Sequence, residues 1–429
     1  EIYTLSLHDA LPIWSAATLC LRVEDSLAAL GALAAFRRQL FAGSLRVAAI
    51  TGSSGKTTVK EMVAAICENA LRDGWANTEP VLKTCGNFNN LVGLPLSLLP
   101  LHAGHRVAVM EMGMSAPGEI AALTGITDPD LGCINTVHPA HLQGLGSLAG
   151  VAAAKGELFH AMRPEAVRVV NEDDPRIWRI AEASGGSRIG FALTEAGLAR
   201  HPLVSVRDLE NLGPAGLRFT LHIGSWHQRI DLPALGEHNA HNAAAAAAIA
   251  VALGITPENI ALGLARYRPL ERRLALRKLP GGLQVLNDVY NANPASMAAG
   301  LRTLAALATT GGRTRSVAVL GDMLELGADS ARLHREIGEL AAALHLDWLA
   351  VSGGQAKEIA AAAQEAGMAA GRVLVFAAPA EIGLWCAGLF RAGRLEQGDW
   401  IFVKGSRGMH MEGFIEELER QLSGEAHAL

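Results

Sequence analysis

Short apolar runs and longer amphipathic stretches alternate along the first half of the chain. The apolar run Leu45–Ile50 ends at a glycine-rich turn, and a helix is expected to follow it over Val59–Asn69. The alternation continues with the strands Val107–Met110, Gly132–Asn135 and Val167–Asn171 and the helix Leu148–Met162. Strands that alternate with helices in this way predict a parallel sheet covered by helices.

The segment from Leu203 to Leu232 has a different pattern, because short strand-like stretches there are separated by turn signals. It is predicted to form an antiparallel edge of the same sheet. The alanine-rich stretch Asn239–Leu253 follows it, and alanine is the strongest helix former.

A second alternation begins near Gly282 and predicts a Rossmann-like domain. Its expected strands are Leu283–Asn287, Ser316–Leu320, Trp348–Val351, Val373–Phe376 and Trp400–Val403. Its expected helices are Ser296–Leu307, Ala331–Leu344, Ala356–Ala366, Pro379–Phe390 and Met411–Leu422. The arginine-rich stretch around Pro269 separates the two alternations, and we place the domain boundary at Arg273.

The N-terminal region does not predict a domain of its own. Residues Cys20–Phe41 form one amphipathic helix, and Glu1–Trp14 has none of the regions of a signal peptide. We interpret residues 1–14 as a non-native, adaptor-derived segment. The alternative is an ordinary N-terminal strand.

Composition limits the class of protein. The 429 residues are 50% hydrophobic and 18% charged with a formal charge of −5, which indicates a soluble protein of two or three domains and no nucleic-acid partner. The five cysteines are scattered without CxxC spacing, so a zinc cluster is not expected. The longest apolar run, Ala243–Leu253, is too short to span a bilayer. We expect a cytoplasmic monomer without membrane insertion.

The strongest chemical signal lies between the first strand and the first helix. It is a phosphate-binding loop formed by Gly52, Ser53, Ser54, Gly55, Lys56, Thr57 and Thr58. Backbone amides and the helix N-terminus would hold the phosphates, Lys56 would contact the β- and γ-phosphates, and the Thr57 hydroxyl would bind Mg²⁺. The general GxxxxGK[ST] pattern has glycine where this chain has Ile50, so a chance Gly/Ser turn is the alternative.

The shorter TGxxGKTT form resembles the Mur ligase and folylpolyglutamate synthetase superfamily. The segment from Lys83 to Pro95 and the GDMLELG stretch at 321–327 resemble the Mur ligases that add D-alanyl-D-alanine. The resemblance implies that Thr84, Asn89 and Asn90 bind substrate. A capped turn is the alternative for the two asparagines.

The resemblance also implies a set of metal ligands. Glu111 ends a predicted parallel strand and corresponds to the family's Mg²⁺ ligand, and His141 corresponds to its metal-binding histidine. Lys155 matches a lysine that CO₂ carbamylates, and a carbamate is an anionic oxygen ligand suited to Mg²⁺. The alternatives are a solvated loop-edge acid for Glu111, a solvated loop residue for His141, beside which His138 is a second candidate, and a surface lysine for Lys155. Gln143 stands where the family usually has an acid, so a role for that acid is in doubt.

Motifs in the second half imply a nucleotide site and an anion site. Asn239 and Asn242 would contact the nucleotide, with an ordinary helix N-cap as the alternative. The residues that would meet ATP from the second domain and the joint are Arg273, Asp288, Tyr290, Asn291, Asn293 and Asp322. Here Asn287 and Val289 replace the family's Asp and Ser. Lys404, Ser406 and Arg407 would bind a phosphate or the dipeptide carboxylate; ordinary turn chemistry is the alternative for these loops.

Together these features predict an α/β protein in which a central doubly wound P-loop domain (45–273) precedes a Rossmann-like ligase domain (274–429). Residues 15–44 would be a remnant of an otherwise missing N-terminal domain for the UDP-linked substrate. The resemblance implies an ATP- and Mg²⁺-dependent ligase that joins D-alanyl-D-alanine to UDP-N-acetylmuramoyl-tripeptide through an acyl phosphate. Alternatives are another Mur or folylpolyglutamate-type ligase, a P-loop nucleotidase or kinase, and a truncated, inactive nucleotide-binding protein.

Overall fold

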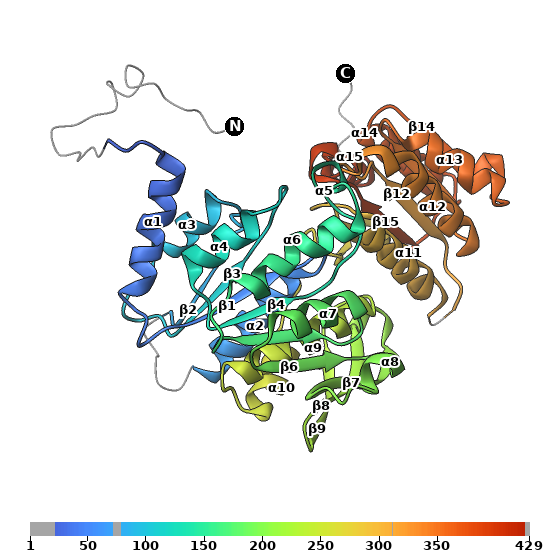
Figure 1. Ribbon diagram of the computed structural model, residues 1–429. Coiled ribbons are helices and arrows are strands. Elements are labelled where there is room, and N and C mark those ends of the chain that lie inside the picture. The colour runs from blue at the N-terminus through green and yellow to red at the C-terminus, as the bar shows by residue number, and fades with distance from the viewer. Residues whose placement is uncertain (1–21, 72–78, 311, 425–429) are drawn as a thin grey trace.

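The computed structural model describes residues 22–71, 79–310 and 312–424. The chain forms two lobes, each built on its own sheet (Figure 1). The predicted adaptor-derived segment 1–14 lies outside the described residues.

The first sheet has nine strands in the order β2-β3-β1-β4-β5-β6-β7-β8-β9. They are β1 (Arg46–Thr51), β2 (Val81–Lys83), β3 (Val107–Glu111), β4 (Leu131–Ile134), β5 (Val167–Asn171), β6 (Arg188–Ala192), β7 (Val204–Asn211), β8 (Leu217–Ile223) and β9 (Trp226–Leu232). The strands from β2 to β7 pair in parallel, whereas β7, β8 and β9 pair antiparallel. The predicted antiparallel edge is therefore confirmed.

Helices cover both faces of this sheet. In β1, Val47 and Ala49 join one apolar cluster and Ala48 and Ile50 join another, as expected for a strand buried on both faces. One face carries α2 (Lys56–Ala70), α9 (His238–Ala252) and α10 (Pro257–Arg266), and the other carries α4 (Glu119–Thr127), α6 (Leu148–Ala161) and α7 (Pro175–Ser184). Short helices α3 (Gly93–Leu98), α5 (Leu142–Leu145) and α8 (Glu195–Leu198) lie in connecting segments.

Helix α1 (Ser26–Gln39) packs on this lobe against α3 and α4. A Cβ on Gly31 would lie 3.0 Å from Ile126, so the two helices approach closely. The buried Arg38 donates to the Thr127 carbonyl at 3.2 Å and pairs with Asp130 at 3.3 Å. These contacts fix the helix to the end of α4.

The second sheet has six strands in the order β10-β11-β15-β12-β13-β14. They are β10 (Ala275–Lys278), β11 (Gln284–Asp288), β12 (Ser316–Leu320), β13 (Trp348–Ser352), β14 (Val373–Phe376) and β15 (Trp400–Lys404). All neighbours are parallel except β10, which pairs antiparallel with β11 and was not predicted. Its helices are α11 (Pro294–Thr309), α12 (Ser330–Ala343), α13 (Ala356–Glu365), α14 (Pro379–Arg391) and α15 (Glu412–Leu422).

The two lobes face each other with the carboxyl ends of their parallel strands directed at one cleft, which places the motif loops together. Within the described part of the chain, no helix is both long and apolar enough to cross a membrane.

Candidate functional site

The cleft between the lobes has a volume of about 1280 Å³. The phosphate-binding loop lines one wall and the loops after β11, β12 and β15 line the other. Most predicted site residues line it; Gly52, Thr84, Lys155 and Asp322 are the predicted ones that do not.

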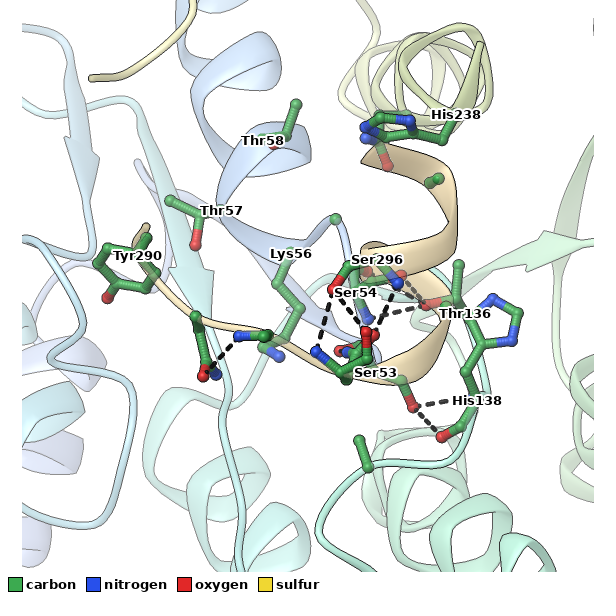
Figure 2. A pocket seen from close by; sticks show the side chains of 18 of the residues that line it. Ser53, Ser54, Lys56, Thr57, Thr58, Thr136, His138, His238, Tyr290 and Ser296 are labelled. Atoms are coloured by element: carbon green, nitrogen blue, oxygen red, sulfur yellow. Dashed lines mark hydrogen bonds between the residues drawn. The ribbon is translucent and has the colours of Figure 1, made fainter. Parts of the chain in front are cut away.

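The phosphate-binding loop joins β1 to α2, as predicted. Gly55 has φ +77°, and a Cβ there would lie 2.3 Å from side-chain atoms of Asn135 and Asn242, so only glycine fits. Lys56 begins α2 and donates to the Gly52 carbonyl at 2.7 Å. Burial lowers the pKa of Lys56, and Glu111 opposes this effect. Figure 2 shows Lys56 and Thr57 beside Tyr290 from the other lobe.

The segment after β4 supports this loop. The Ser53 hydroxyl donates to the His138 carbonyl at 2.8 Å, and the Ser54 amide donates to the Thr136 hydroxyl at 3.0 Å. These contacts fix the backbone that would surround a phosphate.

Asn239 and Asn242 are buried beneath the loop. Asn242 accepts a hydrogen bond from the Asn135 side chain at 3.0 Å and donates to Asn239 at 2.9 Å. Both asparagines line the cleft, but their amide groups are engaged with protein atoms.

Glu111 ends β3, and its side chain is 3% exposed. Asn89 donates to Oε1 at 2.8 Å, whereas Oε2 is buried without a hydrogen-bond partner among the described residues. The Lys60 ammonium lies 4.0 Å from Oε2. A buried carboxylate oxygen that lacks a donor is suited to a cation.

The predicted substrate segment divides into different roles. The Thr84 hydroxyl is buried and accepts from the Glu111 amide at 2.8 Å, which ties the segment to β3. Asn90 accepts from the amides of Val92 and Gly93 at the start of α3, so it forms the capped turn considered as an alternative. Asn89 and Asn90 line the cleft.

His141 has φ +54° and points its Nδ1 at the Glu325 carboxylate of the other lobe, 2.5 Å away. This hydrogen bond lowers the pKa of Glu325. The Glu325 carbonyl also accepts from the Gln143 amide at 3.1 Å. The structure therefore pairs His141 across the cleft, with an acid from the GDMLELG stretch.

Lys155 lies on α6 and is 2% exposed, so the alternative of a surface lysine is wrong. Burial holds its pKa well below the usual value, and the nearby Lys56 adds to this effect. A lowered pKa favours the neutral amine, which is the form that reacts with CO₂.

Arg273 connects the lobes at the joint. It donates from Nη2 to the Thr57 hydroxyl at 2.9 Å, and its guanidinium lies 3.7 Å from the centre of the Tyr290 ring. Burial raises the pKa of Tyr290, while Arg273 opposes the rise. Asn293 caps α11 and donates to the Ser53 carbonyl at 3.0 Å, which gives a second contact between this lobe and the phosphate loop.

The loops after β11 and β15 form a buried ion pair at the cleft. Lys404 is 2% exposed, pairs with Asp288 at 2.5 Å and donates to the Asn291 carbonyl at 2.8 Å. Burial lowers the pKa of Lys404, and Asp288 opposes this effect. Ser406 accepts from the Leu324 amide at 2.8 Å. Arg407 is half-exposed and pairs with Glu412 at 2.6 Å.

Asp322, which was predicted to meet ATP, contacts a loop of its own lobe in this structure. Its carboxylate accepts from the amides of Gly354 at 2.7 Å and Gln355 at 3.0 Å, just before α13. Because both oxygens are occupied by backbone amides and the residue does not line the cleft, Asp322 serves to fix that loop.

Among the described residues, no three His, Cys, Asp or Glu side chains gather as a metal site. Magnesium usually takes one or two carboxylates and otherwise water and substrate phosphates. The free oxygen of Glu111 and the Thr57 hydroxyl therefore fit Mg²⁺ carried in by a nucleotide. This site also includes Asn135, Lys60 and Glu325, which were not predicted from the sequence.

Comparison with known proteins agrees with this architecture. The family model described as Mur ligase middle domain matches residues 50–250, and the model described as Mur ligase, glutamate ligase domain matches residues 272–407. The UDP-N-acetylmuramoyl-tripeptide–D-alanyl-D-alanine ligase of Haemophilus influenzae is 35% identical over 93% of this chain and 82% of that protein. The Escherichia coli ligase of the same name is 37% identical over 79% of this chain and 71% of its own length.

Solved structures give the same result. A crystal structure of MurF from Acinetobacter baumannii is similar with a TM-score of 0.81 and 34% identity, covering 93% of this chain and 82% of that one. The MurF ligase from Thermotoga maritima in complex with ADP has a TM-score of 0.79 and 26% identity, covering 96% of this chain and 88% of that one.

Proposed function

Because this chain belongs to the UDP-N-acetylmuramoyl-tripeptide–D-alanyl-D-alanine ligases of the Mur ligase family, we propose that the cleft between its lobes forms the new amide bond. The protein is an ATP-dependent ligase of peptidoglycan precursor synthesis, and its substrates are UDP-N-acetylmuramoyl-tripeptide and D-alanyl-D-alanine.

The phosphates of ATP lie against the loop from Gly52 to Thr58. The amides of this loop and the N-terminus of α2 bind the phosphate oxygens, and Lys56 contacts the terminal phosphate. Asn239 and Asn242 then contact the nucleotide on one side. On the other side lie Arg273 and a group of residues from the second lobe: Asp288, Tyr290, Asn291, Asn293 and, through its loop, Asp322.

Thr57 and Glu111 hold the Mg²⁺ that accompanies ATP, and His141 with a carbamylated Lys155 holds a second one. When bound, Mg²⁺ neutralises charge that develops on the transferred phosphoryl group. Lys155 supports the carbamate because its neutral amine nitrogen adds to CO₂, forming an N–C bond and releasing one proton. His141 leaves Glu325 when it takes this role.

A carboxylate oxygen of the tripeptide attacks the γ-phosphorus of ATP, and the bond to the bridging oxygen of ADP breaks. The resulting acyl phosphate is attacked at carbon by the amine of D-alanyl-D-alanine. The carbon–oxygen bond breaks, phosphate leaves, and the amine loses a proton. Lys56 stabilises the phosphoryl charge, and contact between the lobes excludes water that would hydrolyse the intermediate.

Substrate contacts come from both lobes. Thr84, Asn89 and Asn90 orient the acceptor end near Glu111, and Lys404, Ser406 and Arg407 face the anionic groups that approach from the second lobe. Three points remain predictions: the domain boundaries at 45, 273 and 274, the origin of residues 15–44, and a monomeric state.

One observation carries this proposal: the buried oxygen of Glu111 without a donor, in the same cleft as the phosphate loop. The test is phosphate release with Mg²⁺-ATP and UDP-N-acetylmuramoyl-tripeptide, with D-alanyl-D-alanine or single amino acids as acceptor. We expect release that depends on the dipeptide and matches amide product. Equal release without any amine, or with single amino acids, would overturn the proposal.

A further inference from the structure

Asn135 follows β4 and lies fully buried beneath the phosphate loop. Its side-chain nitrogen donates to the Ser54 carbonyl at 3.1 Å and to Asn242 Oδ1 at 3.0 Å. Its side-chain oxygen is buried and has no hydrogen-bond partner among the residues that the structure describes. The donor half of this amide therefore makes all of its side-chain hydrogen bonds.

Asn135 is the first of three amide side chains in a relay, in which each side chain donates a hydrogen bond to the next. Asn242 donates to Asn239 at 2.9 Å, and Asn239 donates to the Leu235 carbonyl at 2.7 Å. The backbone of Asn135 is itself held, because Asn171 donates to its carbonyl at 2.9 Å. The relay thus connects α9 and β5 to one peptide bond of the loop.

That peptide bond is the one between Ser54 and Gly55. In a planar trans peptide the carbonyl and the N–H point in opposite directions. The Ser54 carbonyl accepts from Asn135 and, at 3.2 Å, from the Thr136 hydroxyl. Because these donors hold it on the buried side, the Gly55 N–H should be directed away from them, to the side of the cleft that Gly55 lines. Turning this peptide over would remove one donor from a phosphate.

The chemistry of the side chain suits this position. A carboxylate in place of Asn135 could not donate to the Ser54 carbonyl, and its charge would repel phosphate and attract Lys56. A neutral amide holds the loop without either effect.

We propose that Asn135 is a positioning residue for the phosphates of ATP, acting through the Ser54–Gly55 peptide. This inference rests on the proposed function, in that the loop binds ATP. It names a residue that acts on the nucleotide without touching it, in contrast to Lys56 and Thr57.

The test compares Asn135→Asp, which keeps the size of the side chain but removes both donors, with Cys133→Ala. Cys133 is buried on β4, the strand that Asn135 follows, and belongs to the apolar core, so its variant controls for a loss of packing. Binding of fluorescent Mg²⁺-ADP is measured first, because it does not require ligase turnover. We expect Asn135→Asp to weaken binding roughly 10- to 100-fold and Cys133→Ala to leave it within about threefold.

A role in folding alone predicts a different result. In turnover, the KM for ATP should rise in Asn135→Asp while the KM for D-alanyl-D-alanine stays constant. Wild-type nucleotide affinity in a folded Asn135→Asp protein would overturn the inference, as would an equal rise in both KM values. If Asn135→Asp does not fold, Asn135→Ser is measured against the same two outcomes. A wild-type protein that binds Mg²⁺-ADP without joining the dipeptide would refute the proposed ligase function but leave this test valid.

Discussion

Replacing Arg273 by alanine should remove a direct contact between the two lobes while leaving each lobe folded. Arg273 makes two contacts that differ in kind: a hydrogen bond to Thr57 at 2.9 Å in the phosphate loop and a cation–π contact at 3.7 Å with Tyr290. Because Thr57 lies in one lobe and Tyr290 in the other, loss of the guanidinium removes a direct link between them.

The size of the effect follows from these contacts. A hydrogen bond from a charged donor contributes about 1.5–3 kcal/mol, and a partly buried cation–π contact contributes about 0.5–2 kcal/mol. Water will replace part of the first contact, so we expect a loss of about 3 kcal/mol, or roughly 100-fold in kcat/KM for ATP. Arg273→Lys keeps the charge but not the planar stacking, so its kcat/KM for ATP should lie between those of the wild-type protein and Arg273→Ala.

The assay is phosphate release at varied ATP, with Arg272→Ala as the matched control. The neighbouring Arg272 lies 3.9 Å from Glu412 and its side chain is 41% exposed. Such an exposed ion pair contributes about 0–1 kcal/mol, so Arg272→Ala should change kcat/KM by less than about fivefold. If Arg273→Ala behaves like this control, the link that we describe has no part in ATP use.

Three further predictions concern the metal ligands. Glu111→Gln keeps the size of the side chain but removes its charge, so kcat should fall by about 10²–10³-fold and the Mg²⁺ requirement should rise in a metal titration; an unchanged Mg²⁺ dependence would contradict this. Lys155→Ala should lose activity and regain part of it with added acetate or formate, whereas full activity of the variant without any additive would show that no carbamate is needed. In CO₂-free buffer the unfolded chain binds more protons than the folded one only between the lowered folded-state pKa of Lys155 and its ordinary value of 10.5, so the free energy of unfolding should rise with pH through that window; Lys155→Met should flatten this slope in urea titrations, and an identical slope would refute the assigned burial effect.

Strong local patterns of apolar residues predicted many of the helices and strands correctly. Most of the buried strands and the alanine-rich helix were predicted to within a few residues, because burial leaves continuous apolar runs, but β6 was not predicted. The strand β10 was missed, since its sequence ALRK is half polar and forms an exposed edge. The three-residue β2 was missed because it is too short to show a period.

The convergence of the motif loops could also be predicted, because parallel strands direct their carboxyl ends to one edge. Roles that depend on distant partners could not. Asn135 meets Asn242 across 107 residues, and His141 meets Glu325 across 184 residues. Asp322 was predicted to meet ATP, although the amides that bind its carboxylate belong to a loop 32 residues further on. Nothing local in the sequence distinguishes these cases.

The central claim is that the loop around Lys56 binds the terminal phosphate of ATP, and that transfer of this phosphate activates a carboxylic acid. It is tested most directly by labelling the reacting carboxylate of UDP-N-acetylmuramoyl-tripeptide with ¹⁸O and analysing the phosphate released with D-alanyl-D-alanine by mass spectrometry. An acyl phosphate transfers one carboxylate oxygen, so the account predicts one ¹⁸O in each released phosphate and an amide that retains the other. Released phosphate that contains no ¹⁸O, although the carboxylate of the tripeptide was fully labelled, would contradict it.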